Sequence, residues 1–253
     1  MLIAVIALLA AQAGTDRYTR EKEAALGRYL AAEVGRATTA IESAGVRHYV
    51  DQLVGRLVSA MPEATSPFTV TVTAEDRCAA THEPVALPGG FVFVPAALFT
   101  AAESDQEFAA MVAHAMAHAA LPHGRLKPLP GQPADSGPVI LIGEWAGNCG
   151  SESVVPRAMA ASLRDSERAA DALAVRTLAR AGLDPHALLR FVERMPALPD
   201  RDTRLAALRS ILAQQSIGGS VGSGGGEFAA VQEEVRQYIR PARVKQPSLL
   251  QRQ

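Results

Sequence analysis

The alternation of hydrophobic and polar positions divides the chain into helical and extended segments. Apolar residues recur at helical spacing over residues 16–39 and again over residues 46–61. The period then changes to two in residues 68–73, FTVTVT, as in a half-buried strand. The stretch ALPGGFVFVP, residues 86–95, predicts a second strand or a hairpin around its Pro-Gly-Gly turn.

Helical spacing returns after these strands and dominates the rest of the chain. We expect helices over residues 105–121, 157–181, 186–194, 203–214 and 228–238. A Pro-rich loop covers 127–138, and the Gly-rich segment 216–227 reads as a linker to the C-terminal helix and tail, 228–253. The pattern predicts a single α+β domain over 14–253, mostly helical, with a small β-sheet beside helix 105–121.

Residues 1–13 resemble a secretory signal peptide. A short apolar run, LIAVIALLAA, leads to Ala11-Gln12-Ala13, which has the A-x-A form of a cleavage site. The run lacks a preceding Lys or Arg, so a wrongly assigned start or a buried helix end stays an alternative. It is too short to span a bilayer, and no cysteine follows it that would carry a lipid. We expect an exported protein, periplasmic or secreted, with no integral membrane segment beyond this signal.

Composition and charge limit the classes of molecule that the chain is expected to bind. The 253 residues are 48% hydrophobic and 20% charged, with 25 basic against 26 acidic side chains, so the chain is globular and unlike a nucleic-acid-binding protein. The two cysteines, Cys78 and Cys149, form either one disulfide or two separate buried thiols. Neither has a C-x-x-C partner, which excludes a cysteine-based zinc site.

Candidate chemistry lies in VAHAMAHAALPH, residues 112–123. His114 and His118 are four residues apart, so on a helix both rings lie on one face and can bind one metal ion. Such a pair is as often structural as functional. In SERAADALAV, residues 166–175, Glu167 offers a third ligand, and Asp171 lies one turn further on, where it can orient a histidine. The alternative is that both acids belong to a solvated helix face.

Three segments together resemble the HtpX-like gluzincin zinc metallopeptidases, including their periplasmic single-domain members. They are LPGGFVFVPAAL, EFAAMVAHAMAH followed by His123, and ERAADALAVRTLARAGLDP, in this order and spacing. The family pattern is a Pro-Gly-Gly strand, then Glu-x6-His-Glu-x-x-His-x4-His, then Glu-x-x-Ala-Asp, and the resemblance covers about residues 21–204. It implies a gluzincin-like fold and a zinc metalloendopeptidase with one Zn²⁺ per chain, acting on proteins or peptides.

The resemblance also implies roles for particular residues. It makes His114, His118 and Glu167 the zinc ligands, and Asp171 a residue that contacts a ligand without binding zinc. Glu107 supports the histidine helix. His123 is either structural or, like Asp171, a contact of a ligand. The strand around residues 87–94 is expected to be a sheet edge that binds an extended peptide by strand addition. Its substrate-binding residues would be Leu87, Pro88, Gly89, Gly90 and Phe91.

The chain departs from the family pattern at two positions. Ala115 stands where the family has the glutamate that takes a proton from the attacking water, and loss of a general base costs about 10²–10⁴ in rate. Leu198 stands in place of the histidine of a His-Pro-x4-Arg pattern that helps to hold the oxyanion. Glu107 lies two helical turns back and is too remote to replace the base. Glu83, where the family often has asparagine, is a candidate replacement from across the cleft.

These observations leave three hypotheses. The first is a zinc metalloendopeptidase with impaired or absent hydrolysis, because two separate losses are typical of a line that has relaxed catalysis. The second is a pseudopeptidase that binds extended or misfolded polypeptide segments without cutting them. The third is a helical structural domain whose histidines bind nothing. The first two require bound zinc and a polypeptide substrate or client.

Overall fold

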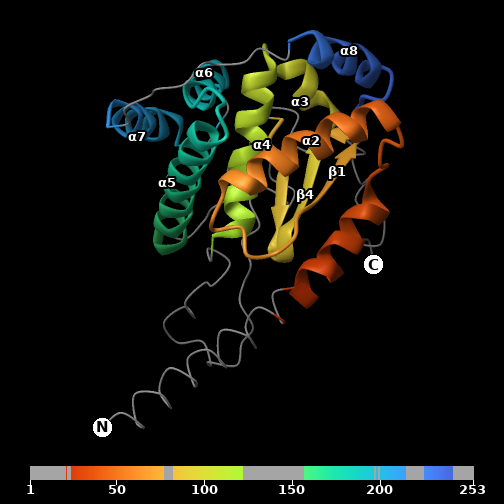
Figure 1. The fold of residues 1–253 in the computed structure, drawn as a ribbon. Helices are drawn as coiled ribbons and strands as arrows, with labels where there is room; N and C mark the ends of the chain where they lie inside the picture. The colour runs from red at the N-terminus through yellow and green to blue at the C-terminus, as the bar shows by residue number, and fades with distance from the viewer. Residues whose placement is uncertain are drawn as a thin grey trace, which may run out of the picture.

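The fold is seen in a computed structural model, which describes residues 21, 24–76, 82–121, 157–196, 198, 200–214 and 225–241. The predicted signal peptide, Cys78, Cys149, His123 and residues 216–224 of the predicted linker lie outside these ranges. The described residues form a mostly helical α+β fold with a three-stranded sheet (Figure 1), which confirms the predicted fold class.

The sheet is built from a hairpin and one parallel strand. Strands β3 (Val85–Leu87) and β4 (Phe91–Pro95) are antiparallel and are joined by the short turn η1 (Pro88–Gly90), so the hairpin alternative is confirmed. Strand β1 (Thr69–Thr73) pairs with β4 in parallel, which gives the order β1-β4-β3. Because β4 is central, the prediction that residues 87–94 form a sheet edge is wrong for Phe91 and the residues after it. Among the described strands of this sheet, β1 and β3 are the edges, and β3 is the edge strand of the hairpin.

Strand β4 is central because both of its faces are apolar. Val92 and Val94 point into the main core, where both are fully buried. On the other face Phe93 joins Leu87 and Val34 in a second cluster, which the helix at residues 24–37 covers. This arrangement places the hairpin between two hydrophobic layers.

Two glycines let the hairpin turn lie close to its neighbours. Gly90 has a φ of 86°, and a Cβ on it would lie 2.3 Å from the Pro67 carbonyl oxygen. Gly27, in the helix at residues 24–37, faces the turn so closely that a Cβ would lie 1.8 Å from the Pro88 carbonyl oxygen. Only a hydrogen at these positions allows such contact between backbones.

The helices fall close to their predicted positions. They are α2 (Ala44–Ala60), α3 (Ala96–Ala101), α4 (Asp105–Ala120), α5 (Arg157–Arg180), α6 (His186–Arg194), α7 (Arg201–Ala213) and α8 (Gly225–Arg236). The six-residue α3 was not predicted, and α8 begins three residues before its predicted start at 228. A small parallel pair, β2 (Glu75–Asp76) and β5 (Arg240–Pro241), was also not predicted.

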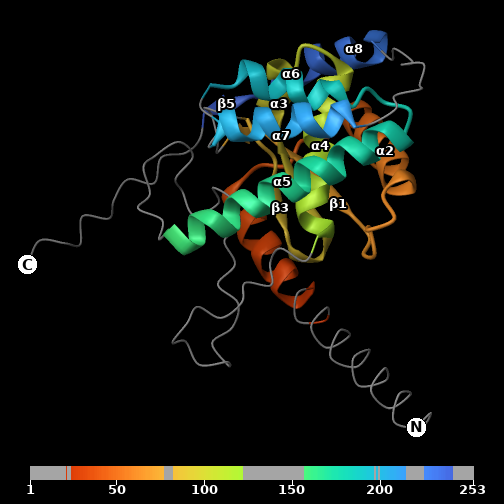
Figure 2. The same cartoon turned by 90° about the vertical axis from the view of Figure 1, so that its left-hand side faces the viewer.

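Helix α4 lies at the centre of the molecule, between the sheet and α5 (Figure 1), and Figure 2 looks onto α5 with α4 behind it. All residues from Gln106 to Ala117 are buried, which explains why α4 is apolar around its whole circumference. The described chain contains no helix that is both long and apolar enough to span a membrane.

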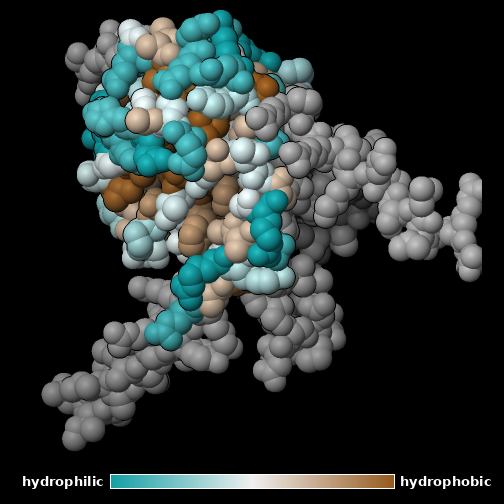
Figure 3. Space-filling view, turned by 90° about the vertical axis from the view of Figure 1, so that its right-hand side faces the viewer, coloured by the Kyte–Doolittle hydropathy of each residue, from teal (hydrophilic) through white to brown (hydrophobic). Residues whose placement is uncertain are grey.

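Helix α8 packs against α2 and α3 at one end of the hydrophobic core. Phe228 packs among Tyr49, Phe99 and Phe108, with ring centroids 5.6–6.2 Å from its own. Its neighbour Gln232 donates hydrogen bonds to the carbonyl oxygens of Phe99 and Ala102. The face shown in Figure 3 mixes hydrophilic and hydrophobic residues. In the described part of the chain, the exposed large hydrophobic residues are Tyr29 and Val58.

Candidate metal centre

The histidine helix begins at a well-defined N-terminus. Ser104 caps α4 by accepting a hydrogen bond from the Glu107 amide at 3.2 Å. The buried Glu107 carboxylate accepts from the Glu103 amide at 2.9 Å and is paired with Arg194 of α6. Glu107 therefore joins the start of α4 to α6, about two helical turns from His114.

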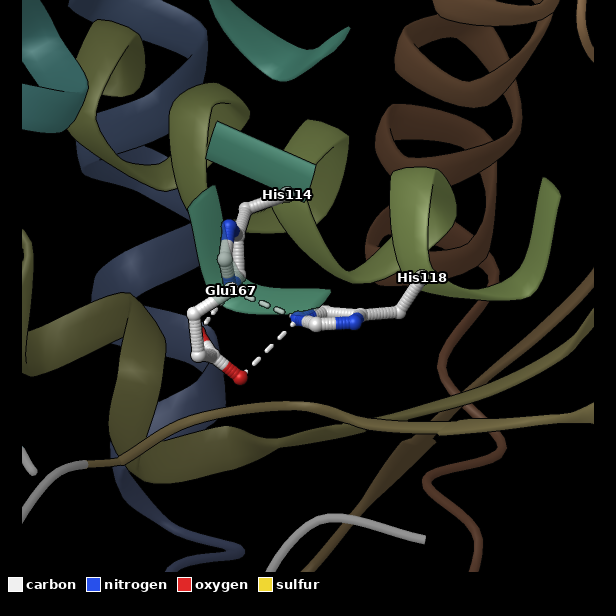
Figure 4. Close-up of side chains that lie close together, drawn as sticks. All are labelled: His114, His118 and Glu167. Carbon is white, nitrogen blue, oxygen red and sulfur yellow. Dashed lines mark hydrogen bonds and ion pairs between the residues drawn. The ribbon is translucent and has the colours of Figure 1, made fainter. Parts of the chain in front are cut away.

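Three side chains from two helices converge at the other half of α4. The Nε2 atoms of His114 and His118 lie 3.1 Å apart. Glu167, on α5, places one carboxylate oxygen 3.4 Å from His114 Nε2 and the other 3.3 Å from His118 Nε2 (Figure 4). Among the described residues, these three form the group of His, Cys, Asp and Glu side chains whose donor atoms all lie within 4.8 Å of one another.

The separations between the donor atoms match what a zinc ion requires. Zinc binds histidine nitrogen and carboxylate oxygen at about 2.0–2.1 Å in a tetrahedral arrangement, which puts neighbouring donors about 3.3 Å apart. The three measured separations, 3.1, 3.3 and 3.4 Å, all lie near this value. The residues present therefore fit a metal ion with no rearrangement of the helices.

Exposure differs across the group in a way that leaves one side open. The His114 side chain is 5% exposed, whereas those of His118 and Glu167 are 24% and 32% exposed. A catalytic zinc site keeps one position for water or substrate, while a structural site is enclosed by four protein ligands. Three converging donors with a partly exposed side leave room for water or substrate at a fourth position.

Asp171 lies behind His114, one turn along α5 from Glu167. Its Oδ1 atom is 2.9 Å from His114 Nδ1, although the ring N–H does not point directly at that oxygen. With Nδ1 facing Asp171, the Nε2 atom of the same ring is left to face Glu167 and His118. A carboxylate in this position fixes the orientation of a metal-binding histidine and increases its basicity.

Arg204 of α7, which stands at the arginine of the His-Pro-x4-Arg pattern, is a central partner of the site. Its guanidinium donates two hydrogen bonds to Asp171, at 2.8 and 3.1 Å. Its Nη1 atom is 3.3 Å from Glu167 Oε2 and 3.4 Å from Glu83 Oε1. Only 3% of the Arg204 side chain is exposed. The carboxylates therefore offset the free-energy cost of burying its positive charge.

The charges of the site shift its pKa values in consistent directions. Burial alone would lower the pKa of His114, but contacts with Asp171 and Glu167 raise it to about 9. Burial raises the pKa of Asp171, but Arg204 and His114 outweigh it and lower the pKa. For Glu167, burial likewise raises the pKa, and His118, His114 and Arg204 lower it well below its usual value. The carboxylates are thus ionised, and the site attracts positive charge.

The positions that depart from the family pattern are both buried. Ala115 is 2% exposed and contributes only a methyl group beside the histidines. Leu198 is 4% exposed and belongs to the main core. Glu83 lies just before β3 and reaches the site through Arg204, so it is close to Glu167 although 84 positions separate the two in the sequence.

Comparisons with known proteins agree with this geometry at the level of a family. Residues 44–132 match the family model described as "Peptidase family M48". The "Putative beta-barrel assembly-enhancing protease" of Vibrio cholerae serotype O1 is 28% identical over 163 residues, which are 59% of this chain and 33% of that protein. The "Beta-barrel assembly-enhancing protease" of Yersinia pestis is 23% identical over 187 residues, 69% of this chain and 38% of that protein.

The chain spans about a third of the length of these two relatives. The resemblance to HtpX-like members in particular stays a prediction. What the comparisons establish is that residues 44–132, the segment that carries His114 and His118, match peptidase family M48.

Proposed function

We propose that the chain binds one zinc ion through His114, His118 and Glu167 and acts on polypeptides as a protein of the metallopeptidase type. The observation that carries this proposal is the set of three donor separations, which lie near those of a tetrahedral zinc site. The match of residues 44–132 to a peptidase family supports the same class.

Charge balance is a second argument for a divalent cation. Glu167, Asp171 and Glu83 bring three carboxylates to one guanidinium, that of Arg204. With both histidines neutral, as metal ligands must be, these four groups carry a net charge of about −2. One Zn²⁺ neutralises this charge. Because these groups are largely buried, neutralisation lowers the electrostatic free energy of the site.

Each protein group then has a distinct task. A bound zinc ion polarises the scissile carbonyl and lowers the pKa of water. Asp171 holds the His114 ring with Nε2 toward the ligand group, and Arg204 holds Asp171 and Glu167. Position 115 supplies no proton acceptor, because it is alanine. Without another proton acceptor, hydrolysis should therefore be slower by about 10²–10⁴ than with a glutamate at this position.

The substrate that suits this site is an extended polypeptide segment. Strand β3 is the edge beside the hairpin among the described strands, and α4 packs against β3 and η1. An extended chain that pairs with β3 would lie next to the histidine end of α4. We take β3, which ends at Leu87, as the binding edge, and Phe91 as the start of the strand behind it. The turn Pro88–Gly90 is packed against Gly27 and Pro67 and is left out of this edge. Export, directed by residues 1–13, would bring the chain to unfolded proteins outside the cytoplasm.

A metal analysis tests the ligand set. Purified protein should contain about one zinc per chain, and His114→Ala or Glu167→Ala should lose it. His186→Ala is the matched control, because that histidine is exposed on α6 and pairs only with Asp184 among the contacts described for it. A metal-free wild-type protein after reconstitution with excess zinc would contradict the proposal.

A second measurement concerns catalysis at position 115. On an unfolded protein substrate, zinc-loaded Ala115→Glu should cut faster than the wild-type chain, by as much as about 10²–10⁴-fold where no other carboxylate acts as the general base. Equal rates in the two proteins would show that position 115 is not where the base acts.

A pseudopeptidase is the alternative function, and Ala115 and Leu198 favour it, because neither side chain can accept or donate a proton. In this case the zinc-loaded protein binds unfolded polypeptide along β3 without cutting it. Binding with no hydrolysis in either the wild-type chain or Ala115→Glu would select this alternative.

A further inference from the structure

Glu83 lies beside the candidate metal centre although it is far from the other site residues in sequence. It stands in the segment that leads into β3, and its side chain is 19% exposed. Its Oε1 atom is 3.4 Å from Arg204 Nη1, and the same nitrogen is 3.3 Å from Glu167 Oε2. The carboxylates of Glu83 and Glu167 therefore share one guanidinium nitrogen.

Glu83 is close to the ligand group without belonging to it. Within the described part of the chain, the donor atoms that lie within 4.8 Å of one another come only from His114, His118 and Glu167. A fourth ligating carboxylate would enclose the ion and block substrate. A carboxylate just outside the ligand group, by contrast, leaves the metal position open, and a general base acts from such a place when it reaches the water.

The location of Glu83 in the fold also fits a role in catalysis. It precedes the β3 edge, while the ligands come from α4 and α5 on the other side. A polypeptide paired with β3 would pass between these two sides. The carbonyl to be attacked would then lie between the ligand group and the strand end that carries Glu83.

We propose that Glu83 supplies the proton-accepting carboxylate that position 115 lacks, an inference that rests on the function proposed above. The carboxylate takes one proton from a water molecule as the water oxygen bonds to the peptide carbonyl carbon. It gives this proton to the peptide nitrogen as the C–N bond breaks. One water is consumed, a carboxyl and an amino end are formed, and Glu83 returns to its starting state.

Arg204 gives Glu83 a fixed position for this task. Its guanidinium is buried and donates two hydrogen bonds to Asp171. The ion pair holds Glu83 Oε1 on the same guanidinium nitrogen that contacts the ligand residue Glu167. Arg204 acts in this scheme as a positioning residue.

The test compares full-length, zinc-reconstituted proteins: wild type, Glu83→Gln, Ala115→Glu and the double variant. Zinc content is measured first and should be one per chain in all four. Hydrolysis of an unfolded protein substrate by Glu83→Gln should then fall about 10²–10⁴-fold below that of the wild type. The double variant should cut far faster than Glu83→Gln, because a glutamate at position 115 makes Glu83 dispensable.

The matched control is Glu63→Gln. Glu63 is half-buried and pairs with Arg176, 3.7 Å away. Arg176 is on the same helix as Glu167, about 13 Å further along it. Its substitution should change neither zinc content nor hydrolysis. Loss of activity in both glutamine variants would indicate a general effect of charge removal and would overturn the proposal.

Binding of a small peptide hydroxamate provides a readout that does not depend on turnover. A carboxylate at this place accepts a hydrogen bond from the hydroxamate, so Glu83→Gln should weaken binding about 10- to 100-fold, and Glu63→Gln should not. Unchanged affinity and unchanged hydrolysis in Glu83→Gln, with zinc still bound, overturn the role of Glu83 alone. A wild-type chain that binds zinc but never cuts also overturns it, whereas absence of zinc overturns the proposed function itself.

Discussion

At the scale of single residues, the site is a group of opposite charges held below the surface. Arg204 is the only guanidinium among the described residues that contacts Asp171, Glu167 and Glu83 together. Removal of one partner from such a group leaves the others buried without compensation, which is far more costly than loss of an exposed ion pair. Two predictions follow from this contrast between buried and exposed charge.

The first prediction concerns Arg204→Met. It should lower the free energy of unfolding by about 3–5 kcal/mol, because Asp171 stays buried without its counter-charge. Arg209→Met, on the same helix, removes only the exposed pair with Glu193 and should cost less than about 1 kcal/mol. Urea unfolding of both variants measures the difference. The loss in Arg204→Met should be smaller with zinc present, since the ion then supplies positive charge.

The second prediction concerns pH. The pKa of His114 is raised from 6.5 to about 9, so its protonation stabilises the metal-free fold fully below about pH 6.5. This contribution is lost as the pH rises through about 9. Because zinc must displace the same proton, zinc affinity should rise about tenfold per pH unit between about pH 7 and pH 9. Calorimetric titration measures this slope, and a flat profile would show that His114 is not a ligand.

At the scale of elements, the hairpin β3-η1-β4 depends on close backbone contacts. The helix at residues 24–37 touches the turn through Gly27, and the strand end touches Pro67 through Gly90. These contacts hold the β3 edge in place above α4. Substitutions there should act on the position of the edge as well as on stability.

The third prediction is that Gly27→Ala lowers the free energy of unfolding by about 1–3 kcal/mol, because its Cβ would overlap the Pro88 carbonyl group. Gly35→Ala is the control in the same helix. Nothing lies within 4 Å of a Cβ at position 35, so alanine there should be neutral or stabilising by up to about 1 kcal/mol. Equal effects in the two variants by urea unfolding would contradict the close contact.

Local patterns in the sequence predict the helices and the convergence of His114, His118 and Glu167 well, because both depend on spacing within an element. His114 and His118 lie on one face of α4, and Glu167 and Asp171 on one face of α5, as a period of 3.6 requires. The centrality of β4 also has a signal in its continuous apolar run, FVFV, which indicates a strand covered on both faces. The edge prediction overlooked this run.

The role of Arg204 could not be predicted in the same way. Arg204 is 33 positions from Asp171 and 121 positions from Glu83, and no periodicity links them. Their contact depends on how α7 packs against α5 and on the path into β3. The short α3 was missed for a related reason, since six residues give too little of a period to recognise.

At the scale of the whole molecule, the ligand group joins two helices that the chain connects only through residues outside the described ranges. His114 and His118 come from α4, and Glu167 comes from α5, which packs along it. A metal bound here links the centre of the fold to its outer layer. Removal of the metal should therefore destabilise both helices.

The fourth prediction is that zinc at 100 times its dissociation constant raises the free energy of unfolding by about 2.7 kcal/mol. A chelator should reverse this gain and should speed hydrogen exchange in both α4 and α5. In His114→Ala the addition of zinc should change neither quantity. A zinc effect of the same size in this variant would place the metal elsewhere.

The position of α8 has a consequence for the order in which the core is completed. Phe228 fills the aromatic cluster of Tyr49, Phe99 and Phe108, and Gln232 satisfies the last carbonyl groups around α3. All of these partners precede α8 in the chain. This end of the core therefore stays open until Phe228 docks, even when α4 and α5 are already in place. Completion of the core thus depends on a helix that contributes no residue to the group of His114, His118 and Glu167.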